Sequence, residues 1–196
     1  MPSKLCFSRI NRPAIQNYYL GFYTAAKIHG ASHQQVQRDY IMTAIPKLND
    51  ISKNSYDIRF FTSSHWPVKN IATKKADAGT YRISSPGLTA LDLIHHQTKL
   101  GGLSRMLATI EELAEEINKH DIAELLRWYP NRSTLQRFGF LLEEIGGYED
   151  YLKEIIEHLK SIKYFPVLLS PNSQQKPGSV NNIWKVDVNV KIESDL

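Results

Sequence analysis

The sequence predicts an α+β fold, and three features of its hydrophobic pattern lead to this prediction. An apolar stripe at helical spacing comes first, short β-branched and aromatic runs follow, and four amphipathic helical stretches joined by short loops come next. An alternating segment near the end indicates a strand. We therefore expect a mixed or antiparallel sheet from residues 37–83 plus the C-terminal strand, packed with an N-terminal helix and a small helical bundle.

The N-terminal helix is predicted from Pro13 to His29. Pro13 suits the first helical position and Gly30 suits the residue after the last turn. The apolar stripe of this helix holds Ile15, Tyr19, Phe22 and Ala26.

The predicted strands lie in the next fifty residues. The runs at Tyr40–Ala44, Tyr56–Thr62 and Tyr81–Ile83 are β-branched and aromatic, and turn-forming residues separate them. A hairpin turn is expected at residues 76–80. Its two arms carry Lys74, Lys75 and Arg82, which brings positive charges close together.

The pattern of the second half of the chain predicts helices. Ser85 before Pro86 has the pattern of a capping hydroxyl followed by proline at the first helical position. The apolar set from Leu103 to Ile117 repeats at steps of three and four, and outward glutamates on that helix are expected to be solvated. Further helices are expected around residues 122–126, 135–145 and 148–162, and their short connections indicate a bundle of antiparallel neighbours.

The C-terminal segment alternates between apolar and polar residues from Trp184 to Glu193. This alternation is typical of a strand with one face in water. We expect it to pair with the sheet of residues 37–83, after the apolar run Phe165–Leu169 and a polar loop.

Charge is distributed unevenly along the 196 residues. The net charge is +4, but residues 1–100 hold 13 basic and 5 acidic side chains, whereas residues 101–196 hold 11 and 15. A basic half can attract a polyanion such as nucleic acid through its phosphates, or form a solvated surface. We expect a basic arm at residues 1–17 and one domain at residues 18–196.

The chain lacks the apolar centre of a signal peptide, long apolar runs and more than one cysteine. These features favour a cytoplasmic protein without membrane contact, in which Cys6 is an ordinary thiol.

Common catalytic motifs are absent from the sequence, including the glycine-rich phosphate loops, the paired-histidine zinc helix and the nucleophile elbow. His29 and His33 are spaced for a metal on one helix face, but Gly30 interrupts the helix and no third ligand lies nearby. We therefore expect no enzyme activity, cofactor or metal. His95 and His96 are expected at a helix end, where an imidazolium is favourable.

Asp92 is the one acidic residue inside an apolar helical run, and burial without a partner would be costly. We expect Arg82 or Arg105 to pair with it as a structural ion pair.

Basic and amide side chains form the candidate nucleic-acid site. Such groups can contact phosphates and base edges, although the cluster at residues 33–38 can equally cap a helix end. The candidate residues are Lys4, Arg9, Arg12, Lys27, His33, Gln34, Arg38, Lys74, Lys75 and Arg82.

Five segments in order resemble the AbiEi family. They are YYLGFYTAAKIHGASHQQVQ at residues 18–37, YRISSPGLTALDLIHH at 81–96, GGLSRMLATIEELAEEI at 101–117, LQRFGFLLEEIG at 135–146 and WKVDVNVKIESDL at 184–196.

This resemblance implies a bacterial antitoxin of a type IV toxin–antitoxin system, active in abortive infection and phage resistance. It implies a transcriptional regulator that represses its own operon and counteracts a nucleotidyltransferase-like toxin encoded beside it, without needing a stable complex. Family members typically carry an N-terminal winged helix for operator DNA. Only about seventeen residues precede the match, too few for a three-helix DNA reader. We expect that reader to be lost, removed or supplied elsewhere, leaving weak or auxiliary DNA binding.

Two other hypotheses remain open. The helical half can serve as a protein-interaction module that neutralises the toxin by direct contact. Alternatively, an enzyme would need a convergent polar pocket around Asp92 and His95, and a paired, sealed Asp92 would exclude it. SerPro at 85–86, GlyGly at 101–102 and GlnArg at 136–137 match the family pattern and are interpreted as cap, helix start and packing.

Overall fold

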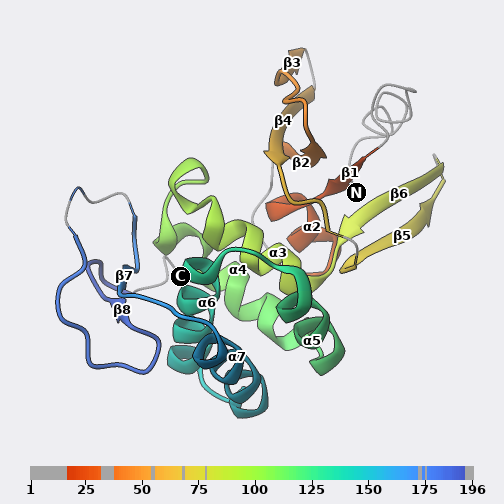
Figure 1. Ribbon diagram of the computed structural model, residues 1–196. Helices are drawn as coiled ribbons and strands as arrows, with labels where there is room; N and C mark the ends of the chain where they lie inside the picture. Colours follow the sequence, from red (N-terminus) through yellow and green to blue (C-terminus); the bar gives the residue numbers. More distant parts are fainter. Residues whose placement is uncertain are drawn as a thin grey trace.

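The computed structural model describes residues 17–31, 38–53, 56–67, 69–77, 79–171, 174 and 176–192. Among these residues a six-stranded mixed sheet lies beside a group of packed helices, which confirms the predicted α+β class (Figure 1). The strands of this sheet are β1 (Tyr18–Leu20), β2 (Asp39–Ala44), β3 (Ile51–Lys53), β4 (Tyr56–Ser63), β5 (Ile71–Ala76) and β6 (Gly79–Ser84).

The helices follow the sheet in the chain, except for the short helix α2 between β1 and β2. A 3-10 turn, η1 (Gln97–Lys99), separates α3 from α4. The helices are α2 (Phe22–Ile28), α3 (Pro86–His95), α4 (Leu103–Glu116), α5 (Lys119–Trp128), α6 (Arg132–Ile145) and α7 (Glu149–Ser161).

The sheet has the strand order β3-β4-β2-β1-β6-β5. Strand β1 lies between antiparallel β2 and parallel β6, and β2 pairs in parallel with β4. The hairpins β3–β4 and β5–β6 form the two edges. They project from the body of the molecule as two separate arms (Figure 1).

The prediction of one helix over Pro13–His29 is wrong in its described part, because Tyr18–Leu20 form strand β1 and the helix starts only at Phe22. Strand β1 is buried on both faces. Tyr19 packs into one hydrophobic cluster, whereas Tyr18 and Leu20 pack into another. A run that is apolar on both faces carries no alternation, so its pattern does not separate a strand from a helix. Residues 13–16 lie outside the described part of the chain.

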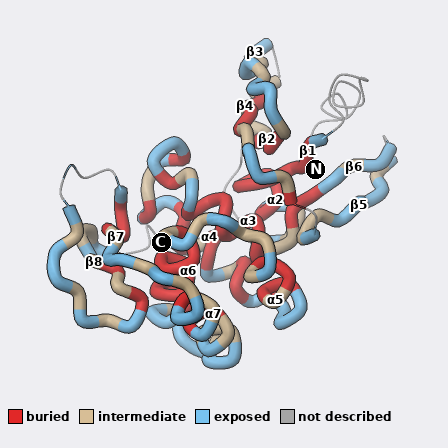
Figure 2. The backbone as a smooth tube through the Cα atoms, viewed as in Figure 1, coloured by how far each residue is buried: buried red, intermediate tan, exposed pale blue. Residues whose placement is uncertain are grey.

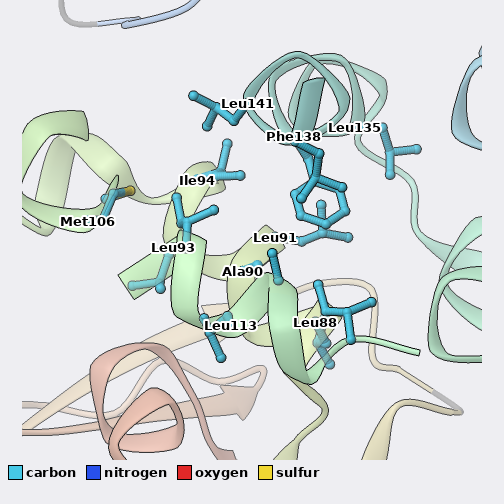
Figure 3. Packing of buried hydrophobic residues seen from close by; sticks show 14 of the residues in the cluster. Leu88, Ala90, Leu91, Leu93, Ile94, Met106, Leu113, Leu135, Phe138 and Leu141 are labelled. Carbon is cyan, nitrogen blue, oxygen red and sulfur yellow. The ribbon is translucent and has the colours of Figure 1, made fainter. Parts of the chain in front are cut away.

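Helix α3 lies between the sheet and the other helices. Every residue from Gly87 to Ile94 is buried. Figure 3 shows its side chains packed against Met106 and Leu113 of α4 and against Phe138 and its neighbours on α6. The predicted cap is confirmed, because Ser85 Oγ accepts a hydrogen bond from Leu88 N and Pro86 occupies the first turn.

Helices α4 to α7 lie at the predicted positions, but the predicted bundle of consecutive neighbours is wrong in part, because α6 packs on α7 whereas α5 packs on α3 and α7, and α4 packs on α3 and α6. Each of α4 to α7 buries an apolar stripe, and Gly102 precedes α4 with a positive φ of 88° that favours glycine. Figure 2 shows burial concentrated in α3 and the surfaces that face it, while hairpin β5–β6 is largely exposed. Over the described residues, none of the helices combines the length and apolar character that crossing a membrane requires.

The C-terminal segment does not return to the main sheet, contrary to the prediction. Its short strand β8 (Val186–Asp187) instead pairs in parallel with β7 (Val167–Leu168) as a separate two-stranded sheet. Trp184 anchors this segment on α6, where Gly139 has no side chain to obstruct the indole.

Two buried polar side chains of α6 hold the same segment. Gln136 Nε2 donates to the carbonyl oxygens of Phe165 and Trp184, at 2.9 and 2.7 Å, and Arg137 Nε donates to Leu168 O at 2.8 Å. The packing role interpreted for the GlnArg pair agrees with these contacts.

We expect Gly139→Ala to destabilise the protein by about 1–3 kcal/mol, because the new methyl group would overlap the indole ring of Trp184. The measurement is the free energy of unfolding in urea. Trp184→Leu in the Gly139→Ala background is the control, since the smaller side chain leaves space for the methyl group and should reduce the added cost. Equal stability of Gly139→Ala and the native chain would contradict this packing account.

Candidate functional site

A pocket of about 390 Å³ opens at the seam between the sheet and the helices. Strands β1, β2 and β4, the segment after β4, helix α3 and the α5–α6 connection all contribute to it. Its lining combines one carboxyl group, three imidazoles, hydroxyl groups and aromatic rings. The lining residues are Tyr19, Met42, Thr62, Ser63, Ser64, His65, Pro67, Leu88, Asp92, His95, His96, Trp128, Tyr129, Pro130 and Asn131.

Asp92 is the acid of the pocket, and its exposed fraction is only 5%. Its predicted pairing with Arg82 or Arg105 is wrong, because the Tyr19 hydroxyl donates to Asp92 Oδ2 at 2.9 Å. Burial raises the pKa of Asp92 to about 7, and the bond from Tyr19 lowers it only in part. A neutral donor suffices here because the carboxyl group is close to its ionisation midpoint at neutral pH.

His95 has a defined tautomer. Asn131 Oδ1 accepts from Thr134 N, which orients the amide so that Asn131 Nδ2 donates to His95 Nδ1 at 3.0 Å. Nδ1 is then an acceptor, and Nε2 carries the proton of the neutral ring. Burial, with Arg137 and Lys99 nearby, lowers the pKa of His95.

His96 is enclosed by aromatic rings. Its ring packs edge-on against Phe61 and Phe22, with centroids 4.9 and 5.5 Å away, and against His95 at 4.6 Å. Burial lowers the pKa of His96 to about 3. Both histidines lie at the predicted helix end, where burial opposes the favourable effect of the terminal carbonyls on an imidazolium.

Thr62 contributes a hydroxyl group without a partner. Its Oγ1 is buried, and it makes no hydrogen bond within the described part of the chain. Trp128 Nε1 donates to Asn70 Oδ1 at 2.7 Å, which holds the indole in place. The lining therefore combines a fixed indole with a buried hydroxyl group that has no partner among the described residues.

The electrostatic character of the pocket follows from its lining. None of the described lining residues is Lys or Arg, and the rings of His95 and His96 are neutral at pH 7. Over the residues that the structure describes, no three His, Cys, Asp or Glu side chains cluster in a way that could hold a metal ion. The arrangement suits hydrogen-bond donors and disfavours anions.

The candidate nucleic-acid contacts on the sheet, Lys74, Lys75 and Arg82, lie on two different faces of hairpin β5–β6. Thr73 pairs with Arg82, and Lys75 pairs with Thr80, so Lys75 and Arg82 share one face. Lys74 pairs with Tyr81 and lies on the other face. The Lys74 charge contributes to lowering the pKa of His29, whose main cause is burial.

The other candidates are scattered. Arg38 Nε bonds Asp57 Oδ2 at 2.7 Å, which offsets its charge, while Lys27 is exposed in the last turn of α2. His29 Nε2 donates to Ser84 O at 2.8 Å, which agrees with a hydrogen-bonding role at the helix end rather than a metal site. The remaining candidates, Lys4, Arg9, Arg12, His33 and Gln34, lie outside the described residues, as does Cys6.

Asp121 is a buried acid that no motif in the sequence singles out. Its carboxylate accepts from Gly87 N at 2.8 Å and from Asn70 Nδ2 at 2.6 Å. The first bond satisfies a free N–H at the start of α3. Local patterns do not identify this role, because Asp121 and Gly87 are 34 residues apart.

Comparison with known families decides the identity of the fold. The model of the AbiEi antitoxin C-terminal domain matches residues 19–144. The chain belongs to the AbiEi antitoxin family. The predicted resemblance is thereby confirmed, and membership supports an antitoxin role.

Among solved structures, the AbiEi chain is similar to the Rv2827c protein from Mycobacterium tuberculosis. The TM-score is 0.67 at 15% identity, and the match covers 95% of this chain and 68% of the other. At that identity the similarity concerns the fold. No curated protein matches the chain significantly.

The part matched by the AbiEi family contains every lining residue of the pocket, from Tyr19 to Asn131. It also contains Lys27, Arg38 and the basic hairpin. Both the pocket and the basic surface therefore lie within the domain that defines the family.

We expect the stability of Asp92→Asn relative to the native chain to depend on pH. The folded-state pKa of Asp92, about 7, exceeds its unfolded value of 3.8, so native stability is lost as the pH rises through this interval. The Asn variant lacks this loss and should gain about 2–3 kcal/mol over the native chain between pH 5 and pH 8.

Urea unfolding at the two pH values measures this difference. Asp150→Asn, at an exposed position of α7, is the matched control and should follow the native chain. A stability difference for Asp92→Asn that does not change with pH would mean that the carboxyl group titrates normally.

Proposed function

We propose that this AbiEi chain counteracts a nucleotidyltransferase-like toxin encoded beside it, and that it acts by recognition rather than by catalysis. Membership of the antitoxin family over residues 19–144 carries this proposal. Asp92 is paired with Tyr19, but it lines the open pocket together with His95, so only half of the condition that would exclude an enzyme is met.

Polynucleotide contact through hairpin β5–β6 is the second part of the proposal. The hairpin projects from the sheet, and Lys74, Lys75 and Arg82 are exposed on it (Figure 2). Cations on a projecting, solvated arm can approach phosphates at little cost in desolvation. Such contacts carry little sequence information, so they would assist an operator-binding domain rather than replace it.

Direct contact with the toxin is the alternative, and exposed apolar side chains near the C-terminal sheet favour it. Phe165, Ile183 and Val188 have exposed fractions of 63%, 45% and 48%. The Tyr164 hydroxyl donates to Ile183 O at 2.9 Å, which ties two of these segments together. An interface here would lie in the second half of the chain, beside β7 and β8 rather than on the helices.

Co-expression in bacteria with the adjoining toxin gene tests the antitoxin role. We expect growth to be rescued by residues 1–196 alone, and no rescue at matched expression would contradict the proposal. Co-purification in physiological salt separates the two modes of action. A type IV pair should come apart, whereas a complex that is disrupted by Phe165→Ser would favour direct contact.

We expect replacement of Lys74, Lys75 and Arg82 by Glu to weaken polynucleotide binding and to flatten its salt dependence. Each phosphate interaction that the substitutions remove should reduce the slope of log K against log salt by about 0.9 on duplex DNA. Fluorescence anisotropy across a salt series gives this slope. Lys153→Glu with Lys160→Glu, on exposed positions of α7, is the charge-matched control, and an equal effect there would reject the hairpin as the contact surface.

A further inference from the structure

The pocket at the seam has the properties of a built binding site. Its volume of about 390 Å³ lies in the range of small-ligand sites, roughly 300–1,000 Å³. Its polar groups come from β1, β4, α3 and the α5–α6 connection, so the tertiary fold brings them together. Two of these groups are costly to bury: the carboxyl group of Asp92, which bonds only the neutral hydroxyl of Tyr19, and the hydroxyl group of Thr62, which has no partner among the described residues.

The charges of the lining side chains determine which ligand charge the pocket favours. Asp92 is the acid in the lining, and no lysine or arginine is among the described lining residues. A phosphate or carboxylate would find no cation here and would face Asp92. A cation would gain the carboxylate as its counter-ion, and the burial of Asp92 strengthens this attraction.

The aromatic rings and the acceptor groups of the pocket favour a planar cation. Aromatic rings of Tyr19, Trp128 and Tyr129 line the walls, and a guanidinium stacks on such faces better than a compact ammonium does. A guanidinium also presents five N–H donors. Asp92 keeps lone pairs beyond the bond from Tyr19, and Thr62 Oγ1 has no partner in the described part of the chain, so both can accept. The hydroxyl groups of Ser63 and Ser64 already bond His65.

We propose that the pocket formed by Tyr19, Thr62, Asp92, His95 and Trp128 binds an alkylguanidinium group, with Asp92 as counter-ion. The group can belong to a small free alkylguanidine or to an arginine side chain of a protein partner. This binding goes beyond the antitoxin role and does not depend on the basic hairpin.

Proton release should accompany binding, because the cation pairs with the ionised form of Asp92. The pKa of this group is about 7 in the free protein. The titratable groups that line the pocket with it are Tyr19, Tyr129, His95, His96 and, on the segment after β4, His65. Burial raises the pKa of both tyrosines and lowers that of His95 and His96, so these four stay neutral between pH 7 and pH 8. Affinity should therefore rise about twofold from pH 7 to pH 8.

Isothermal titration calorimetry with three probes tests the proposal. The probes are agmatine, N-acetyl-arginine methylamide and N-acetyl-citrulline methylamide, which replaces the guanidinium by a neutral urea of similar shape. We expect a guanidinium probe to bind at least tenfold more tightly than the citrulline probe. Tighter binding of agmatine would identify a free alkylguanidine as the source, and tighter binding of the capped arginine would identify a protein side chain.

Variants test whether the pocket is the site. Asp92→Asn keeps an acceptor for the Tyr19 hydroxyl and should weaken guanidinium binding at least tenfold, whereas Asp150→Asn on α7 should leave it unchanged. Thr62→Val preserves side-chain volume and should weaken binding several-fold, which provides a second test if Asp92→Asn fails to fold. The proposal is overturned if no guanidinium probe binds at about 5 mM, if the citrulline probe binds equally well, or if these variants bind like the native chain.

Discussion

The burial of helix α3 on all sides is the constraint on which the rest of the structure depends. A helix that is apolar around its whole circumference needs a cover on every face, and α3 packs against α2, α4, α5, α6 and strand β6. The sheet and the bundle therefore share one hydrophobic cluster, which extends from Tyr19 to Val186. Neither layer could keep its inner face out of water without α3.

The same constraint explains why the pocket lies where it does. Asp92 is a polar residue in the middle of this buried helix, so the fold must supply a partner or a passage to solvent. Tyr19 supplies the partner from β1, 73 residues away. The seam beside β4 supplies the passage, and His95 and His96 line it because they end the same helix. A packing requirement thus places titratable groups together in the antitoxin domain.

Local patterns in the sequence predict most of the helical part of the fold. The caps of α3 and the stripes of α4 to α7 follow from spacing within each segment, and the structure confirms them. Strand β1 escapes prediction because Tyr18–Leu20 are buried on both faces, so their apolar run fits a helix as well as a strand. The alternation after Trp184 correctly indicates extended chain, but it does not predict which element this chain packs on. Gly139 makes space for Trp184 on α6, and nothing in the local sequence distinguishes it from other helical glycines.

The candidate site is predictable only in part, for the same physical reason. Asp92 stands out within its own helix, and a costly buried acid is visible from local sequence alone. Its partner is not visible, since Tyr19 fits a helix stripe and an ion pair is the simplest expectation. The burial that lowers the pKa of His96 also comes from tertiary packing against Phe22 and Phe61.

Native-state hydrogen exchange of the α3 amides tests the central claim most directly. If α3 is the centre of the shared core, its amides from Leu91 to Ile94 should exchange only through global unfolding. The amides of β1 and α6 should then exchange at the same free energy. Exchange of β1 and β2 at a clearly lower free energy than α3 and α6 would show that the sheet opens independently. That result would contradict a core that the sheet and the helices share through α3.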